Sequence, residues 1–210
     1  MADSPITYTE ELKRKLIHLS SLWMVFAVVL IPNSWVTAGV FALLLAITVG
    51  AERAYVRRVP IISQIYAFLF GHMLRKTPKP GAWLVSGGAY VLMSALLVTV
   101  LYSQVAAGGA MTVMLTGDAA AALIGRRFGR HKTANGKSLE GVAGFILVGG
   151  LALTIYLFLI GASWQLFLAG FVALFPACMA EFYSKQIHID DNFSVPLIVG
   201  VFLQAALYLM

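Results

Sequence analysis

The sequence has little charge and a single cysteine. Asp, Glu, Lys and Arg make up 11% of its 210 residues and hydrophobic residues make up 60%, whereas soluble domains carry about 25% charged and about 45–50% apolar residues. This composition argues against a water-soluble monomer and against a disordered chain. Glycine shows no fixed period, which excludes a collagen-like rod. Cys178 has no second cysteine with which to form a bridge, and no CxxC motif or neighbouring histidine indicates zinc.

Charge is missing from long stretches of the chain. The charged residues fall in four blocks, at 1–15, 52–79, 118–140 and 181–191, and the runs 16–51, 80–117, 141–180 and 192–210 contain none. Because a helix needs about 20 residues to cross the bilayer core, each of the first three runs can hold two crossings and the last run one. The pattern predicts an all-α integral membrane protein in which residues 1–210 form a single polytopic domain. The seven expected spans lie near 17–31, 35–51, 82–101, 105–124, 142–160, 164–181 and 193–210.

The charge distribution also predicts an orientation. Seven spans place the four charged blocks on one side of the membrane and the expected hairpin turns, 32–34, 102–104 and 161–164, on the other. All 15 Lys and Arg residues then lie on one face, which the positive-inside rule makes cytoplasmic. We therefore expect the N-terminus inside, the C-terminus outside, and a location in the cell (inner) membrane with the active site facing the cytoplasm.

Residues 59–74 admit two interpretations. This uncharged stretch has Ile61, Ile65 and Phe68 at helical spacing, but it also contains Gln64 and His72. It is short for a span and has basic residues on both sides. A helix lying in the cytoplasmic interface is favoured, and a further spanning helix is the alternative.

The chemically informative block begins at Asp118, about two turns inside the predicted end of the fourth span. An acid at that depth is costly, so it should face a polar cavity, an ion or a cation. Simple pairing with an arginine would also explain it. A basic loop rich in glycine follows, containing Gly125, Arg126, Arg127, Gly129, Arg130, Lys132, Gly136 and Lys137. Glycine backbone and arginine forks suit an anion such as phosphate, although positive-inside charge or anionic lipid explains such a loop as well.

Further acidic residues are expected at the same membrane level as Asp118. They are Glu140, at the start of the fifth span, Glu181, at the end of the sixth, and Asp190 and Asp191 before the seventh. Hard carboxylates that can hold Mg²⁺, next to cations that bind phosphate, are typical of phosphoryl or nucleotidyl transfer.

Three segments together resemble the CTP-dependent lipid-alcohol kinases, a family that includes dolichol kinase, phytol kinase and the CTP-using diacylglycerol kinase. The segments are Gly117-Asp118 to Lys132, Gly136-Lys137-Ser138-Leu139-Glu140-Gly141, and Asp190-Asp191-Asn192 to Leu197. Arg14, Lys15 and His18 near the first span, and Glu52 with Arg53 after the second, resemble the same family. The likeness covers residues 13–200. It implies transfer of the γ-phosphate of CTP to the hydroxyl of a polyprenol, a phytol-like prenol or diacylglycerol, with Mg²⁺ or another divalent cation.

The resemblance and the residue chemistry together give a set of expected site residues. The expected catalytic residues and metal ligands are Asp118, Glu140 and Asp191, with Asp118 acting either as base or as principal ligand. The expected nucleotide-binding residues are Gly117, Gly125, Arg126, Arg127, Gly129, Arg130, Lys132, Lys137, Ser138 and Asn192. Arg14, Lys15, His18, Glu52 and Glu181 are further candidates. The expected partners are CTP, a lipid alcohol and the bilayer, and no nucleic acid polymer.

Two other functions stay open at this point. A CDP-lipid synthase similar to phosphatidate cytidylyltransferase would use the same nucleotide, but the usual Pro-Gly-His-Gly-Gly turn of that enzyme is absent. A small transporter or a scaffold would suit the intramembrane Asp118. Against a transporter, the ionisable residues gather at one membrane face and no internal repeat is visible.

Overall fold

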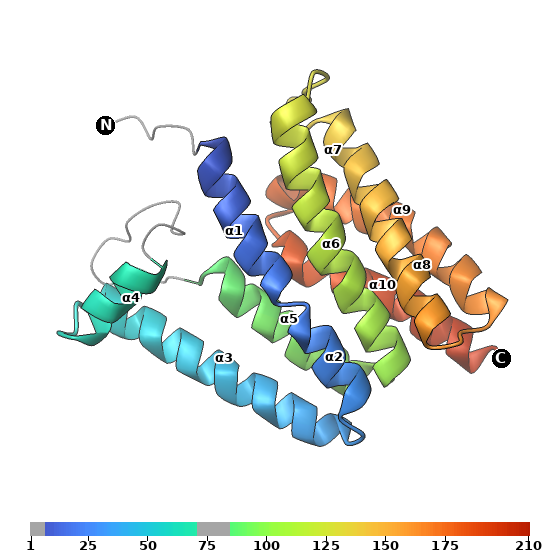
Figure 1. Ribbon diagram of the computed structural model, residues 1–210, viewed down its shortest axis with the longest axis horizontal. Coiled ribbons are helices and arrows are strands. Elements are labelled where there is room, and N and C mark those ends of the chain that lie inside the picture. The colour runs from blue at the N-terminus through green and yellow to red at the C-terminus, as the bar shows by residue number, and fades with distance from the viewer. Residues whose placement is uncertain (1–6, 71–84) are drawn as a thin grey trace.

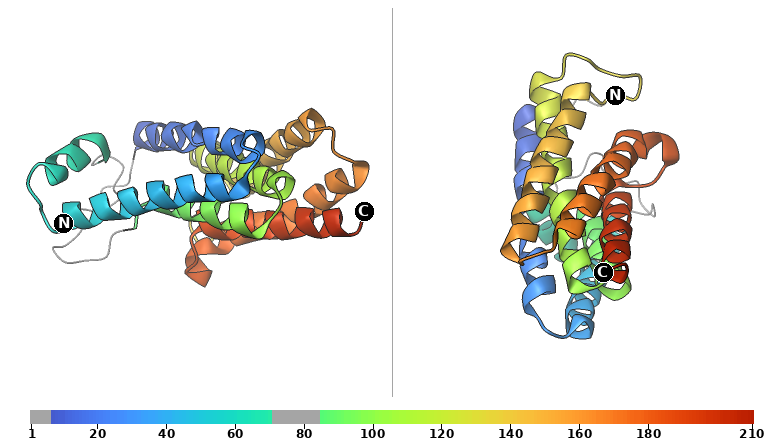
Figure 2. Two further views of the ribbon diagram at one scale, coloured as in Figure 1. Left: turned by 90° about the horizontal axis from the view of Figure 1, so that it is seen from below. Right: turned by 90° about the vertical axis from the view of Figure 1, so that its right-hand side faces the viewer.

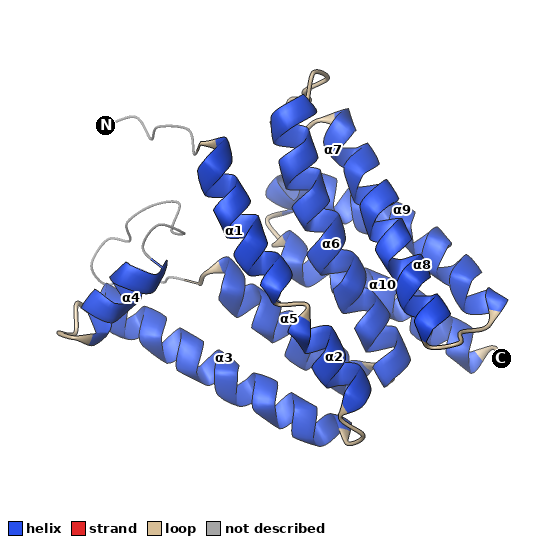
Figure 3. Cartoon of the chain, viewed as in Figure 1, coloured by secondary structure: helices blue, strands red, loops and turns tan. Residues whose placement is uncertain are grey.

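A computed structural model describes residues 7–70 and 85–210 (Figure 1). The regular elements of these two ranges are helices, as Figure 3 shows, apart from an isolated bridge between Lys132 and Ser138. Their order is α1 (Tyr8–Ser20), α2 (Trp23–Leu30), α3 (Ser34–Val56), α4 (Ile62–Phe70), α5 (Gly87–Leu101), α6 (Gln104–Phe128), α7 (Leu139–Gly144), the π-helix η2 (Phe145–Gly149), α8 (Gly150–Leu159), α9 (Trp164–Ile187) and α10 (Asp191–Tyr208). The prediction of an all-α chain is confirmed for the described residues.

Within the described ranges, five helical segments are long and apolar enough to cross a membrane. They are α3, α6, α9, α10 and the continuous stretch of α7, η2 and α8 over Leu139–Leu159. These segments coincide with five of the predicted spans, which supports a membrane protein. The predicted spans 17–31 and 82–101 coincide in part with shorter helices, the α1–α2 pair and α5, and residues 82–84 fall outside the described ranges.

The predicted hairpin turns are confirmed as helix boundaries. The Asn33 side chain accepts a hydrogen bond from the Trp35 amide at 2.9 Å, and Ser103 caps α6 in the same way through the Ala106 amide at 3.4 Å. Small polar residues are favoured at such positions because the first amides of a helix have no partner within the helix. Between α8 and α9, Gly161 has φ +65°, a left-handed conformation that suits glycine.

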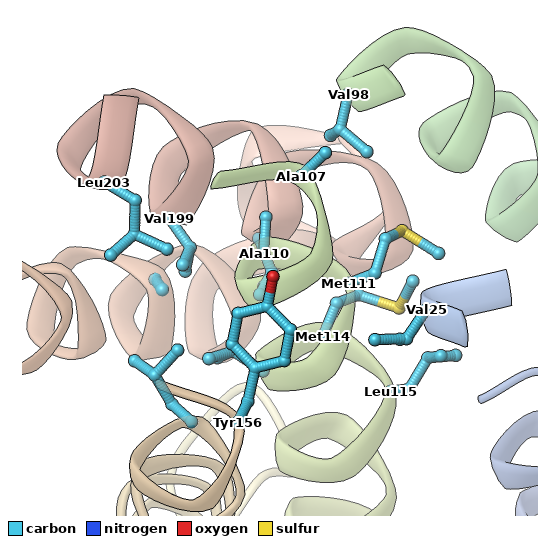
Figure 4. Close-up of a cluster of buried hydrophobic side chains, with 14 of the residues drawn as sticks. Val25, Val98, Ala107, Ala110, Met111, Met114, Leu115, Tyr156, Val199 and Leu203 are labelled. Carbon is cyan, nitrogen blue, oxygen red and sulfur yellow. The ribbon is translucent and has the colours of Figure 1, made fainter. Parts of the chain in front are cut away.

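Helix α6 is the centre of the bundle and α3 lies at its edge. In α6, 78% of the residues in its most apolar stretch are buried, whereas in α3 the corresponding share is 17%. Small residues allow α6 to approach its neighbours closely: a Cβ at Gly109 would lie 2.7 Å from Cδ1 of Leu203 in α10. Figure 4 shows the resulting core, in which Ala107, Ala110, Met111, Met114 and Leu115 of α6 face residues from α2, α5, α8 and α10. The tight packing around α6 fixes the position of Asp118, which lies on the same helix.

The helix α4 occupies part of the stretch predicted to lie in the interface. It has nine residues, which rise about 14 Å and so fall short of the roughly 30 Å hydrocarbon core. Ile65 and Phe68 are exposed on it, which suits a helix lying on the membrane surface. The rest of the predicted segment, residues 71–74, lies outside the described residues.

Candidate functional site

Three carboxylates from three different helices meet inside the bundle. Asp118 of α6, Glu181 of α9 and Asp191 of α10 each place a side-chain oxygen within 4.8 Å of the others, and we call this group the carboxylate cluster. Asp118 and Glu181 are 4% and 6% exposed. Isolated buried charges are very unfavourable, so such a group needs cations close by.

Two buried or half-buried lysines supply positive charge to the cluster. Lys15 of α1 places its Nζ 2.5 Å from Oδ2 of Asp118. Lys137 precedes α7 and places its Nζ 2.6 Å from Oε1 of Glu181 and 3.5 Å from Oδ2 of Asp191. With His18 neutral, three carboxylates and two ammonium groups leave a formal charge of −1. Binding of one divalent cation would therefore change the formal charge of this group from −1 to +1.

Lys137 is positioned by the loop 131–138, which we call the basic loop. The Lys137 amide donates to Oδ1 of Asn135 at 2.9 Å, and the Asn135 side chain donates to the carbonyl of Phe182 in α9 at 2.9 Å. Gly136 adopts φ +82°, which a residue with a side chain rarely adopts. Lys137 also donates to the carbonyl of Glu181 and, at 3.2 Å, to Oγ of Ser184. The loop thus holds its lysine against α9.

The N-terminus of α10 carries Asp191 into the cluster. Asp190 caps this helix by accepting from the Asn192 amide at 3.0 Å and from the Asn192 side chain at 2.7 Å. Ser94 of α5 donates to the Asn192 carbonyl at 2.5 Å, so the turn is tied to a second helix. Oδ1 of Asn192 is buried and has no hydrogen-bond partner among the described residues. Buried polar atoms rarely lack a partner, so this oxygen is available to a ligand or a water.

Arginines of α1 and α6 meet around a buried acid. Glu11 is 3% exposed and its carboxylate lies 3.2 Å from Nη2 of Arg14 and 3.4 Å from Nη2 of Arg126. Nη1 of Arg14 is buried and has no hydrogen-bond partner within the described ranges. The Arg127 guanidinium lies 5.7 Å from the ring centre of Tyr8, a cation–π contact. The basic residues at 14–15 and at 126–127 therefore form one region, on adjacent helices (Figure 1).

Ion pairs connect three of the four charged blocks. Lys15 with Asp118 joins the first block to the third, and so does Glu11 with Arg126. Lys137 with Glu181 and Asp191 joins the third block to the fourth. Of the five acidic residues expected at one membrane level, the structure brings Asp118, Glu181 and Asp191 together, and Lys15 and Lys137 reach the same place. His18 lies there too, with Nε2 3.3 Å from Oδ2 of Asp118 in a geometry that makes no hydrogen bond.

Glu140 lies apart from this group. Its carboxylate accepts from the His131 amide at 3.2 Å and lies 2.7 Å from Nδ1 of the His131 ring. The structure thus brings Glu181, not Glu140, into the cluster as the third carboxylate. The physical reason is the helix geometry: Glu140 sits in the first turn of α7, where its carboxylate faces the start of the basic loop.

Glu52 is also placed elsewhere. It is fully buried near the end of α3 and accepts from the Ser86 amide at 3.3 Å, at the start of α5. Tyr66 of α4 is a further partner. Burial and the neighbouring Glu52 raise the pKa of Tyr66 to about 12, so its hydroxyl keeps its proton. These contacts anchor α4 and α5 to α3. This structural role is enough to explain why Glu52 is buried.

Several glycines predicted to bind nucleotide have a packing role. A Cβ at Gly117 would lie 2.9 Å from Cε2 of Phe145, and a Cβ at Gly129 would lie 2.7 Å from Oγ of Ser138. Gly125 lies against the same Ser138 hydroxyl, where a Cβ would be 3.0 Å away. Ser138 itself caps α7 by accepting from the Gly141 amide at 3.1 Å. The close approach of α6 and α7 accounts for these residues without an anion, whereas Arg126, Arg127, Arg130 and Lys132 are exposed and can meet one.

Two residues of the site were not predicted from the sequence. Glu11 connects the arginines, and Ser184 accepts from Lys137 and lies 3.5 Å from Oδ2 of Asp191. Each stands three positions from a predicted residue on the same helix, Glu11 from Arg14 and Ser184 from Glu181. Residues at this spacing share a helix face, which is the signal that could have found them.

Comparisons with known proteins give one relative with no assigned activity. The chain is similar to an uncharacterised protein of Rickettsia prowazekii (strain Madrid E), RP860, with 25% identity over 187 residues that cover 89% of this chain and 90% of the relative. None of the protein-family models searched matches the chain, and no solved structure matches it. The match covers nearly the whole of both chains, so the two proteins are similar in length.

Proposed function

We propose that the protein is a CTP-dependent kinase that transfers the γ-phosphate of CTP to the hydroxyl of a membrane lipid alcohol at the cytoplasmic face. The observation that carries this proposal is the carboxylate cluster, which stands between two lysines and beside a group of arginines. Phosphoryl transfer depends mainly on positioning and on neutralising charge, and these residue types supply both. The segments that resemble the lipid-alcohol kinases contain Asp118, Lys137 and Asp191, which come together here.

The donor set of the cluster fits a hard divalent cation. It offers only oxygen ligands, and with Asp118 kept as the base, Glu181 and Asp191 are the carboxylates that would hold Mg²⁺, which is usually bound by one or two carboxylates together with substrate phosphates. A bound divalent cation would neutralise charge on the phosphates of the donor nucleotide. The unpartnered Oδ1 of Asn192 adds an oxygen atom beside Asp191. Glu140, expected as a ligand, has no part in this set.

The arginine region is suited to the nucleotide. Arg14 has a buried nitrogen without a hydrogen-bond partner among the described residues, and the guanidinium of Arg126 is partly exposed. In the structure the buried carboxylate of Glu11 holds both side chains, and it pre-orients their planar groups. Phosphate oxygens would bind Nη1 of Arg14, since arginine can bind two anions through separate edges.

The chain's own residues then perform the transfer. A carboxylate oxygen of Asp118 takes the proton of the lipid hydroxyl as the hydroxyl oxygen forms its bond to the γ-phosphorus. The bond between that phosphorus and the bridging oxygen breaks, and CDP leaves with the electron pair. Lys15 and Lys137 are close enough to stabilise the charge that develops on the transferring group.

The same proposal includes seven crossings with the N-terminus in the cytoplasm. Five long apolar helical segments, together with α5 and the uncharged stretch from the end of α1 through α2, would supply the seven crossings. The ion pairs between charged blocks support a common side for those blocks, which the positive-inside rule makes cytoplasmic. The active site then opens towards cytoplasmic CTP.

The decisive experiment follows the label of CTP. Purified protein in lipid nanodiscs receives CTP labelled at the γ- or the α-phosphate, with Mg²⁺ and either prenols or diacylglycerol. We expect γ-label in the lipid phase and α-label in water as CDP. If α-label enters lipid when phosphatidic acid is supplied, the protein is a CDP-lipid synthase. If neither label moves, while a lipid or solute crosses sealed vesicles, the protein is a carrier.

A further inference from the structure

The turn between α3 and α4 holds two residues other than glycine in the left-handed conformation. Arg58 has φ +55° and Ile61 has φ +68°. This conformation is unfavourable for a β-branched residue such as isoleucine and persists only where surrounding contacts impose it. Here the Val59 amide donates to the carbonyl of Ala54 in α3 at 3.0 Å, and Oγ of Ser63 donates to the same carbonyl at 3.3 Å. The turn therefore has a defined shape that returns α4 to the end of α3.

Helix α4 has one face against α3 and another that is exposed. On the inner face, the buried ring of Tyr66 lies 4.8 Å from the ring of Tyr55 in α3, measured between centres. Ile61, Ile65 and Phe68 are all exposed, Phe68 by 83%. Their spacing of four and three positions puts them on one side of the helix. No other described element covers this apolar face, and Figure 2, left, shows α4 at one end of the molecule.

Two exposed arginines stand at the start of the same turn. Within the described ranges, neither Arg57 nor Arg58 has an ion-pair partner. The nearest acid along the chain, Glu52, is fully buried and bonded to the Ser86 amide. From position 53 to position 117 the sequence has no acidic residue, whereas it has six basic ones, at 53, 57, 58, 75, 76 and 79. The surface beside α4 is therefore positively charged and calls for an anionic partner from outside the chain.

The place of this surface in the fold indicates what that partner is. Helix α3 is long and apolar enough to cross a membrane, and the turn follows directly after its end. In a membrane-spanning α3, this end lies at the level of the lipid headgroups. At that level an apolar helix face meets the start of the acyl chains, and guanidinium groups meet phosphates. An acidic soluble protein would match the two arginines but not the apolar face beside them.

We infer that α4 and the turn before it bind the headgroups of anionic phospholipids. Arg57 and Arg58 contact the lipid phosphate, while Ile61, Ile65 and Phe68 enter the acyl region next to it. Phosphatidylcholine also carries a phosphate, but its choline group cancels the charge, so the surface selects lipids with a net negative charge. The inference does not depend on the proposed transfer of phosphate and goes beyond a helix that only rests on the membrane.

The first test measures amide hydrogen exchange of the whole protein by mass spectrometry. The nanodiscs contain phosphatidylcholine alone or an equal mixture with phosphatidylglycerol. We expect exchange within 62–70 to be slower in the mixture by about tenfold, because a lipid that binds the folded helix opposes its opening. High salt should remove most of this difference, since it screens exposed charges. Equal exchange in the two lipids overturns the inference and leaves the arginines to an acidic protein.

Charge variants locate the effect. Arg57→Gln with Arg58→Gln should abolish the difference between the two lipids. Lys13→Gln with Lys185→Gln removes the same charge at exposed positions on α1 and α9, and this matched control should keep the difference. Loss of the difference in both double variants, or in neither, would show that the headgroups respond to the total charge or to other residues, and the inference would be wrong. The wild-type comparison stays decisive if a variant does not fold.

The second test measures the depth of the apolar face. Phe68→Cys and Ala67→Cys, each in a chain with Cys178→Ala, are labelled with bimane in nanodiscs whose phosphatidylcholine carries bromine on its acyl chains. Ala67 is exposed but lies off the apolar face, so it is the matched control. The label at position 68 should be quenched about twofold more strongly than the label at position 67. Equal quenching at the two positions contradicts entry of this face into the acyl region.

Discussion

Asp118 is paired with a lysine from the first helix, at a contact of 2.5 Å that both side chains make almost without exposure to solvent. Its place inside an apolar run makes such an acid visible in the sequence, because an intramembrane carboxylate is costly without a function or a partner. The partner could not be predicted, since Lys15 and Asp118 are 103 positions apart. The identity of that partner gives Asp118 a measurable role in stability as well as in activity.

The first prediction concerns the pair of Asp118 and Lys15. Asp118→Asn should reduce transfer by about a hundredfold or more, because the amide cannot take the proton of the acceptor. It should also destabilise the protein by about 3–5 kcal/mol, because Lys15 remains buried without a counter-charge. Melting in detergent measures the second effect. The double variant Asp118→Asn with Lys15→Met should recover stability but stay inactive. Full activity of Asp118→Asn would remove this residue from the mechanism.

The second prediction distinguishes Glu181 from Glu140. Glu181→Gln should lower the rate by about tenfold or more, because hydrogen bonds to charged groups contribute about 1.5–3 kcal/mol and its bond to Lys137 loses the charge. Glu140→Gln, the matched control, should keep most of the activity, since its contacts are to His131. The measurement is transfer of γ-label together with the Mg²⁺ concentration needed for half of the maximal rate. The reverse order of effects would restore Glu140 as the ligand.

Sequence reasoning found the members of the cluster but not their arrangement. Glu140 and Glu181 both lie at the ends of predicted spans. The sequence therefore predicts a similar depth in the membrane for both and does not distinguish them. Their side-chain directions differ, because Glu140 lies in the first turn of α7 beside His131 while Glu181 points at Lys137. Direction around a helix axis depends on how the helix packs, and packing against distant segments is not visible in a local pattern.

At the scale of elements, α6 and the α7–η2–α8 segment fit together through glycine. Gly117 faces Phe145, and Gly149 would place a Cβ 3.3 Å from Cα of Gly117. Gly117, Ala121 and Gly125 recur at four-residue spacing, which indicates close helix contact but does not tell which helix makes it. The π-helix at Phe145–Gly149 was not predicted, because its apolar residues are equally compatible with an ordinary helix. π-Helical turns occur frequently at functional sites, and this one packs against Gly117, the residue before Asp118.

The third prediction tests this contact. Gly117→Ala should destabilise the protein by about 1–3 kcal/mol, because an added methyl group would overlap with the fully buried ring of Phe145. It should also lower transfer activity, since Asp118 is the next residue. Gly39→Ala in α3 is the matched control: nothing lies within 4 Å of its new methyl group, and alanine favours helix, so stability should not fall. Equal stability of the two variants, measured by melting in detergent, would contradict the tight contact.

At the scale of the whole molecule, the positions of the helices were predictable and their packing was not. Charge-free runs locate apolar helices because the bilayer core excludes charge, and turn residues divide the long runs. The interior position of α6 and the peripheral position of α3 depend on contacts between segments of similar hydropathy. Residues such as Gly108 and Gly109 in α6 admit Tyr156 and Leu203, and this complementarity exists only in the assembled bundle.

The fourth prediction concerns the orientation of the whole bundle. All 15 basic residues fall in the four blocks that are expected on one side, so single cysteines at Asn33, Ser103 and Ser163 should react with a membrane-impermeant maleimide on intact cells. Cysteines at Thr133 and Lys185 should react only after permeabilisation. The native Cys178 is fully buried and is replaced by alanine to remove background. Labelling of Thr133 from outside would place the carboxylate cluster away from cytoplasmic CTP, and both the seven-span topology and the kinase would then be wrong.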